Sequence, residues 1–110
     1  MEASIIYNVT VNVESSIAGS WLQWMLNEHI PDIMASNCFR SYRLVKLLEV
    51  DDSEGPTYAA QYFAASKADY NRYLEIFAPE LRQRSIDKWS ERFVAFRSVM
   101  EVISEGSEKE

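Results

Sequence analysis

Histidine and cysteine are almost missing from this sequence. Its 110 residues contain one histidine, His29, and one cysteine, Cys38. A structural zinc site usually takes four histidine or cysteine ligands, so we expect no metal site within one chain and no resident cofactor. A lone cysteine cannot form an intramolecular disulfide, and the opening MEASIIYNVTV is not the charged and apolar leader of a secreted protein. We therefore expect a cytoplasmic protein.

Glycine, long apolar runs and basic charge are also scarce. The three glycines stand far apart, so the sequence contains no glycine-rich phosphate loop. No run approaches the roughly 18 apolar residues of a membrane-spanning helix, and no membrane partner is expected. Eleven lysines and arginines against seventeen acidic residues give a net charge of -6, which repels polyanions. We therefore expect no nucleic-acid partner either.

Apolar side chains, in contrast, are plentiful. Hydrophobic residues make up 47% of the chain and aromatic residues 13%, enough to build one core without disulfides. Acidic residues gather at the end of the chain in SEGSEKE, which has no apolar side chain to bury. We predict a single domain over residues 1–103, followed by an acidic, disordered tail over residues 104–110.

The period of the apolar residues predicts the first elements. From Ile5 to Val13 the alternate positions are apolar, which is typical of a strand with one buried face. From Ile17 to Leu26 the repeat changes to that of an amphipathic helix. Pro31 disfavours helical geometry at the residue before it, so we expect this helix to end there and a short second helix to begin at the proline.

The rest of the chain predicts a hairpin, a helix and a last strand. FRSYRLVKLLEV and TYAAQYFAA are rich in β-branched and aromatic residues and flank the polar turn DDSEGP. Ser66, with Asp69 three residues later, resembles a capping box and indicates the start of a helix that Pro79 is expected to interrupt. RFVAFRSVMEVI alternates again and predicts the final strand.

The order strand, helix, hairpin, helix, strand is the split βαβ arrangement of a ferredoxin-like sandwich. We therefore predict an α+β fold in which the helices cover one face of an antiparallel sheet. The open face would carry Ile6, Asn8, Thr10 and Asn12 of the first strand, and alternating residues of the other strands make it too apolar to stay fully wet. We expect this open sheet face to pack against a second copy about a two-fold axis, giving a homodimer.

Three pieces of the sequence also resemble a known family. They are the W-x-x-W-M helix that ends in E-H-I-P, the strand T-Y-A-x-Q-Y and the turn A-P-E-L-R. On these motifs the chain resembles the small bacterial family catalogued as domain of unknown function 4286, over nearly its whole length except the acidic tail. The resemblance implies a ferredoxin-like fold of the dimeric α+β barrel type and implies no established activity.

His29 is the candidate for a functional residue. On a helical wheel it lies about 40° from Met25, inside the apolar arc, so its ring is expected to face the sheet. With Tyr7, Trp21 and Met25 it would line a ligand-binding pocket, where an imidazole can act as a general acid or base. The structural interpretation, which we favour, is that His29 caps the carbonyl groups at the end of the helix and packs beside Trp21 and Met25.

Two functions therefore stay open. The one we favour is a non-catalytic homodimeric module that binds a small molecule or a protein partner. The alternative is a cofactor-independent enzyme, oxygenase-like or isomerase-like, with His29 as acid or base, Tyr7 as its polar neighbour and Trp21 as a pocket wall. Some oxygenase-like members of the barrel superfamily combine Asn, Trp and His. Here Asn8 and Asn12 fall on the opposite strand face and are predicted to point away from His29.

Overall fold

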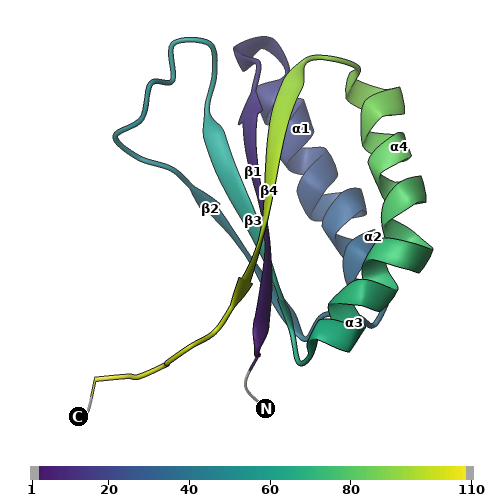
Figure 1. Ribbon diagram of the computed structural model, residues 1–110. Coiled ribbons are helices and arrows are strands. Elements are labelled where there is room, and N and C mark those ends of the chain that lie inside the picture. Colours follow the sequence, from purple (N-terminus) through teal and green to yellow (C-terminus); the bar gives the residue numbers. More distant parts are fainter. Residues whose placement is uncertain (1–2, 109–110) are drawn as a thin grey trace.

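The computed structural model describes residues 3–108, which form a four-stranded antiparallel sheet with helices on one face (Figure 1). The strands are β1 (Ile5–Val13), β2 (Ser41–Lys46), β3 (Thr57–Ala64) and β4 (Phe93–Glu101). Their order in the sheet is β2-β3-β1-β4, which confirms the predicted ferredoxin-like α+β fold. Residues 1–2 and 109–110, which begin the predicted domain and end the predicted tail, lie outside the described residues.

The alternation of β1 places its side chains on the two faces as predicted. Tyr7, Val11 and Val13 are buried in the core under the helices. The register opposes Tyr7 to Tyr62 on β3, whose side chain is also buried under the helices. Because successive side chains of a strand point to opposite faces, Asn8 and its alternate neighbours lie on the uncovered face.

The first helical segment runs through Pro31 without a break. A 3₁₀ turn (Ser15–Ile17) leads into α1 (Ala18–Trp24), a π-helical turn (Met25–His29) and α2 (Ile30–Met34). The amide of Ile30 donates to the carbonyl of Met25, five residues back. This wider turn accommodates the proline ring, which would clash with the preceding turn of a regular α-helix. The prediction that the helix ends before Pro31 is therefore wrong.

The second helical segment also contains a π-helical turn before a proline. It consists of α3 (Lys67–Arg72), a π-helical turn (Tyr73–Phe77) and α4 (Ala78–Trp89). The amide of Ala78 donates to the carbonyl of Tyr73, and Pro79 follows at once, so the prediction that Pro79 interrupts the helix is also wrong. The predicted N-cap is confirmed, because the Ser66 hydroxyl accepts a hydrogen bond of 3.1 Å from the amide of Asp69.

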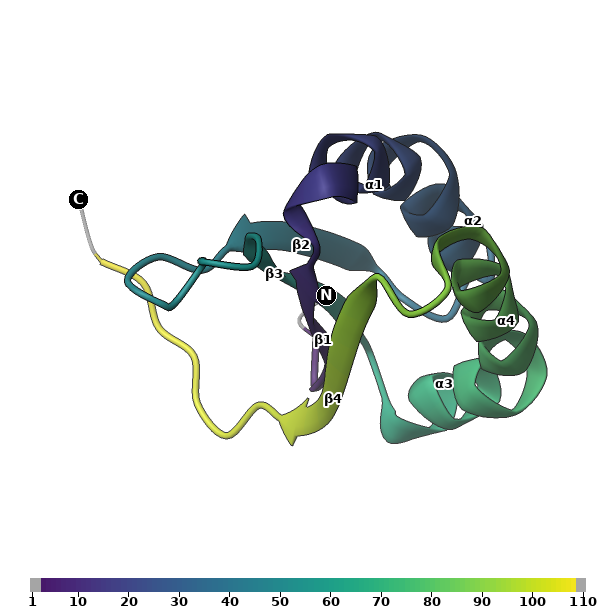
Figure 2. The same cartoon turned by 90° about the horizontal axis from the view of Figure 1, so that it is seen from above.

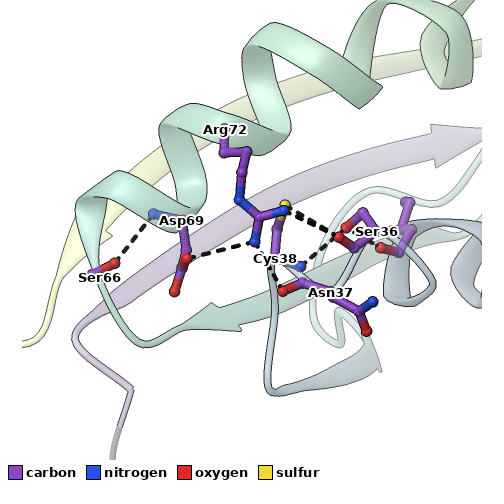
Figure 3. A network of polar contacts seen from close by, with 7 residues as sticks. Ser36, Asn37, Cys38, Ser66, Asp69 and Arg72 are labelled. Atoms are coloured by element: carbon purple, nitrogen blue, oxygen red, sulfur yellow. Dashed lines mark hydrogen bonds and ion pairs between the residues drawn. The ribbon is translucent and has the colours of Figure 1, made fainter.

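Arg72 ties the end of the first helical segment to the start of the second (Figure 3). Its guanidinium donates to the carbonyls of Ser36 at 3.4 Å and Asn37 at 3.1 Å, and lies 3.6 Å from the Asp69 carboxylate. Asn37 closes the turn after α2 with a positive φ of 61°. Beside this network Cys38 is buried, with its thiol free.

Two segments project from the uncovered side of the sheet. Seen from above, the β2–β3 connection and the chain after β4 both extend away from the helices (Figure 2). Residues 104–108 have no regular secondary structure and exposed side chains, while disorder of the tail in solution stays a prediction. Within residues 3–108 no helix combines the length and apolar character needed to cross a membrane.

Gly55, in the β2–β3 connection, provides a test of the packing between that connection and β1. Its φ is +149°, and a Cβ there would lie 1.8 Å from the carbonyl oxygen of Val13. Gly55→Ala is therefore expected to lower the free energy of unfolding by about 2 kcal/mol or more.

The matched control is Gly19→Ala in α1, where nothing lies within 4 Å of the new methyl group. It is expected to raise the free energy of unfolding by about 0.5–1 kcal/mol. Urea denaturation followed by circular dichroism measures both. Equal effects of the two substitutions would contradict the close approach at Gly55.

Candidate ligand-binding cleft

A cleft of about 890 Å³ lies between the helices and the half of the sheet that contains β1 and β4. The residues lining it come from β1, β3, β4, α1, α2, both π-helical turns, α4 and the α4–β4 turn. Ligand pockets typically measure about 300–1,000 Å³ and combine apolar walls with a few convergent polar groups. The cleft therefore has room for a small molecule.

All four residues predicted to line a pocket lie on this cleft. Tyr7 reaches it from β1, Trp21 from α1, and Met25 and His29 from the π-helical turn. The first three are buried, and His29 is half-buried. The structure brings the four together, and their contact with a ligand stays a prediction.

An aromatic cluster holds the ring of Tyr7 in place. Its ring centroid lies 5.4 Å from that of Tyr70, 5.8 Å from Tyr73, 6.0 Å from Tyr62 and 6.2 Å from Phe39. Such distances are typical of attractive aromatic pairs. Burial raises the pKa of both Tyr62 and Tyr73 far above the usual range, so these phenols stay protonated. These two phenols therefore add no charge to the cleft.

Two arginines on the cleft were not foreseen from the sequence. The Nη2 of Arg82, on α4, donates to the hydroxyl of Tyr7 at 3.0 Å, and Arg97 lines the cleft from β4, opposite Val9. The sequence did carry a signal for each. Arg97 occupies an inward position of an alternating strand. Arg82 begins an i, i+3, i+4, i+7 series that ends at Trp89.

His29 stacks on Trp24, with ring centroids 4.5 Å apart and an angle of 19° between the planes. Because the helix continues through Pro31, the interpretation of His29 as a cap at the helix end is wrong. Burial lowers the pKa of His29 to about 4, the Asp32 carboxylate opposes this, and Arg84 and Arg97 reinforce it. The imidazole is therefore neutral at physiological pH.

Asn8 and Asn12 point away from the cleft, as predicted. The amide of Asn8 donates to the Thr10 hydroxyl at 3.0 Å and accepts from Gln61 at 3.2 Å, on the uncovered face of the sheet. Asn12 donates to the Thr57 hydroxyl at 2.9 Å. They cannot join His29 in one site. In residues 3–108 no group of three His, Cys, Asp or Glu side chains is placed to hold a metal ion.

A comparison with protein families assigns almost the whole chain. Residues 4–103 match the model described as domain of unknown function, DUF4286. The chain belongs to this family. The match covers every strand and helix of the DUF4286 fold described above, and it confirms the resemblance drawn from the sequence motifs. A search among curated proteins found no match.

Solved structures similar to this DUF4286 chain share its fold. One is a dimeric ferredoxin-like protein from an uncultured marine organism, with a TM-score of 0.67, 14% identity and coverage of 96% of this chain and 99% of that one. An EthD-like protein from Ralstonia eutropha JMP134 has a TM-score of 0.67 and 14% identity, covering 97% and 98%. The heme degrader MhuD from Mycobacterium tuberculosis, solved with two hemes bound in its active site, has a TM-score of 0.61 and 13% identity, covering 93% and 99%. At these identities the likeness establishes the fold alone.

The lowered pKa of His29 predicts a specific pH dependence of stability. Between pH 6.5, the ordinary pKa of histidine, and about 4, the unfolded chain binds a proton that the folded chain does not. The free energy of unfolding therefore falls with the pH across this window. The loss due to His29 is about 2 kcal/mol between about pH 6.5 and 4.5.

His29→Gln removes this proton and leaves the carboxylates that titrate in the same window. Between about pH 6.5 and 4.5, the free energy of unfolding of the wild type should therefore fall by about 2 kcal/mol more than that of the variant, as measured by urea denaturation. Parallel pH curves would show that His29 titrates normally. The imidazole resonances in an NMR titration give the pKa directly.

Proposed function

We propose that this DUF4286 protein is a homodimeric module that binds a small molecule in the cleft between its helices and its sheet. The observation that carries the proposal is the cleft itself, about 890 Å³ in volume and walled by Trp21, Met25 and His29. The packing of the Tyr7 ring among other aromatic rings supports this, since pre-formed pockets lose little conformational entropy when they bind.

The uncovered face of the sheet supports the homodimer. On β4, Val94, Phe96 and Met100 are opposite Asn12, Thr10 and Ile6 of β1, so all of them share this face. Phe96 is 67% exposed and Val94 54% exposed, an unusual state for large apolar side chains next to one another. A second copy related by a two-fold axis would cover them. Dimeric ferredoxin-like proteins are among the similar structures.

The polar residues of the same face are compatible with burial. Arg43 donates to the Gln61 carbonyl oxygen from Nε at 3.2 Å and Nη2 at 3.0 Å, and Gln61 in turn donates to Asn8. Asn8 continues the chain of hydrogen bonds to Thr10. Asn8, Thr10 and Gln61 satisfy one another on this face, so a second copy can cover these three side chains at a small desolvation cost. The charged Arg43, on the edge strand β2, would stay at the solvated rim of the contact.

The alternative function is a cofactor-independent enzyme with His29 as its acid or base. A neutral imidazole on the cleft favours it, since such a group can accept a proton. A histidine with a pKa of about 4 is nevertheless a weak base at neutral pH, where a general base works best with a pKa near the working pH. This favours binding over catalysis.

Phe96→Glu tests the interface. It places a charge on an exposed apolar side chain within the proposed contact, and we expect a shift from a dimer of about twice 12.7 kDa to a monomer in light scattering after size-exclusion chromatography. Ile76→Glu is the matched control, because Ile76 is 61% exposed on the helical side, and it should leave the dimer intact. A monomeric wild type, or a dimeric Phe96→Glu variant, would contradict the proposed interface.

Native mass spectrometry of untagged protein purified without added ligand tests the cleft. We expect a dimer that carries extra bound mass, and loss of that mass in Ala95→Trp, where the new ring fills the cleft from β4. Ala68→Trp, at an exposed position on α3, is the matched control and should retain it. Bound mass that survives Ala95→Trp would place the ligand elsewhere.

A further inference from the structure

Two positive charges face the cleft without a carboxylate partner among residues 3–108. They belong to Arg82 on α4 and Arg97 on β4. The ion pairs of the described residues involve other arginines, namely Arg72, Arg84 and Arg92. In a chain with a net charge of -6, two such unpaired cations on one cleft are a local reversal of the protein's own charge.

Arg82 and Arg97 stand at similar distances along the chain from the turn that joins their two elements. α4 and β4 run in opposite directions and are joined by a short turn (Figure 1). At 1.5 Å per helical residue Arg82 is roughly 10 Å from Trp89, and at 3.3 Å per strand residue Arg97 is roughly 13 Å from Phe93. Glu91, the acidic residue lining the described cleft, belongs to the turn and so lies at the opposite end.

Electrostatics agrees with this placement. Burial raises the pKa of Tyr73, and the charges of Arg82 and Arg97 both oppose that rise. The same two charges oppose the rise in the pKa of Tyr70, which burial also causes. Both guanidiniums are therefore close enough to Tyr70 and Tyr73 for their charges to act on the two phenols.

Arg82 has a hydrogen-bonding vacancy. Its Nη2 donates to the hydroxyl of Tyr7, while its Nε is buried and has no acceptor among the described residues. An unsatisfied buried donor is costly, and a guanidinium presents its N–H groups in a planar fork that matches a carboxylate. Because Nε is buried, a carboxylate in the cleft would accept from the Nη groups of Arg82, of which Nη1 makes no hydrogen bond among the described residues. The charge of Arg97 would neutralise it further.

The walls beyond the arginines are apolar and flat. Trp24 and His29 form a stacked pair, and His29 is neutral at physiological pH, so this wall carries no charge. Met25 and Phe93 continue the apolar lining. An aromatic ring fits such a wall by offset stacking.

We propose that the cleft selects a small molecule that joins a carboxylate to an aromatic or other flat apolar ring. The carboxylate is held by Arg82 and Arg97 beside the Tyr7 hydroxyl, and the ring packs along Trp24 and His29. This inference rests on the proposed function, since it names the class of ligand for the same cleft. It goes further in predicting selection by charge.

A pair of isosteric probes tests it. 2-Naphthoate and 2-naphthamide have the same flat ring and nearly the same size, and only the first is charged near neutral pH. Isothermal titration calorimetry of the full chain is expected to show about tenfold tighter binding of the naphthoate, because bidentate arginine–carboxylate hydrogen bonds exceed neutral ones. Equal affinities would overturn the inference.

Substitutions assign the selection to the arginines. The double variant Arg82→Met and Arg97→Met keeps the apolar stems, and it should lower the affinity for naphthoate about tenfold while changing that for naphthamide less than about twofold. Arg84→Met removes the same charge from the outer side of α4, where Arg84 pairs with Asp32 and Glu80, and should keep the preference. Arg97→Met alone, at an exposed position, covers the case in which the double variant does not fold.

The outcomes distinguish failure of this inference from failure of the proposed ligand-binding function. If Ala95→Trp blocks both probes and the wild type binds them equally, the cleft binds ligands without selecting anions, and the inference fails alone. If both probes still bind Ala95→Trp with unchanged affinity, they bind outside the cleft and the inference fails. The proposed function fails as well if the bound mass in native mass spectrometry also survives Ala95→Trp. If neither probe binds the wild type, the inference fails, and native mass spectrometry decides the function separately.

Discussion

The hydrogen bond from Arg82 to the hydroxyl of Tyr7 joins the helical layer to the centre of the sheet. Tyr7 lies on β1, the strand that pairs with both β3 and β4, and its ring contacts aromatic rings from four other elements or connections. A phenol in this position brings a large apolar ring into the core and leaves one polar atom that needs a partner. Arg82 meets that need, and this draws a cation into the space where the cleft forms.

The shape of the cleft follows from the two π-helical turns. Each turn of five residues precedes a proline by two positions, at Pro31 and at Pro79. A π turn rotates the residues after it relative to a regular α-helix, so each helix presents an aromatic or imidazole side chain to the sheet and still continues. His29 and Tyr73 both come from these turns and both line the cleft. Two prolines that break helices in isolation thus shape one pocket here.

The sequence predicted the fold well because period is a local signal. The alternation over residues 5–13 matches β1 to the residue, and the order of elements was enough for the topology. The predicted helix breaks at the two prolines were wrong because a π-helical turn before each proline accommodates the missing hydrogen bond. No particular residue type marks a π-helical turn, so the sequence did not indicate it. The helical wheel placed His29 on the correct face of the helix but did not predict its stacking on Trp24. The wheel assumes 100° per residue, whereas each residue of the π-helical turn rotates the chain by a smaller angle. The role of Arg82 was not predicted because its hydrogen-bond partner Tyr7 lies 75 residues away in the sequence, and local patterns do not reveal such a contact.

The alternation of side chains along β1 and β4 places the cleft on one face of the sheet and the proposed dimer contact on the other. The two surfaces therefore share the same strands. On β1, Tyr7 and Val9 face the cleft while Asn8 and Thr10 face the open side. On β4, the exposed Phe96 and the cleft residue Arg97 are consecutive, so they point to opposite faces of an edge strand. As an edge strand, β4 is supported by a neighbouring strand on one side only, where it pairs with β1. In the proposed dimer, contact of Phe96 with the second copy would give β4 further support and so help to hold Arg97 in position relative to Arg82. Assembly would then set the geometry of the anion site without contributing a residue to it.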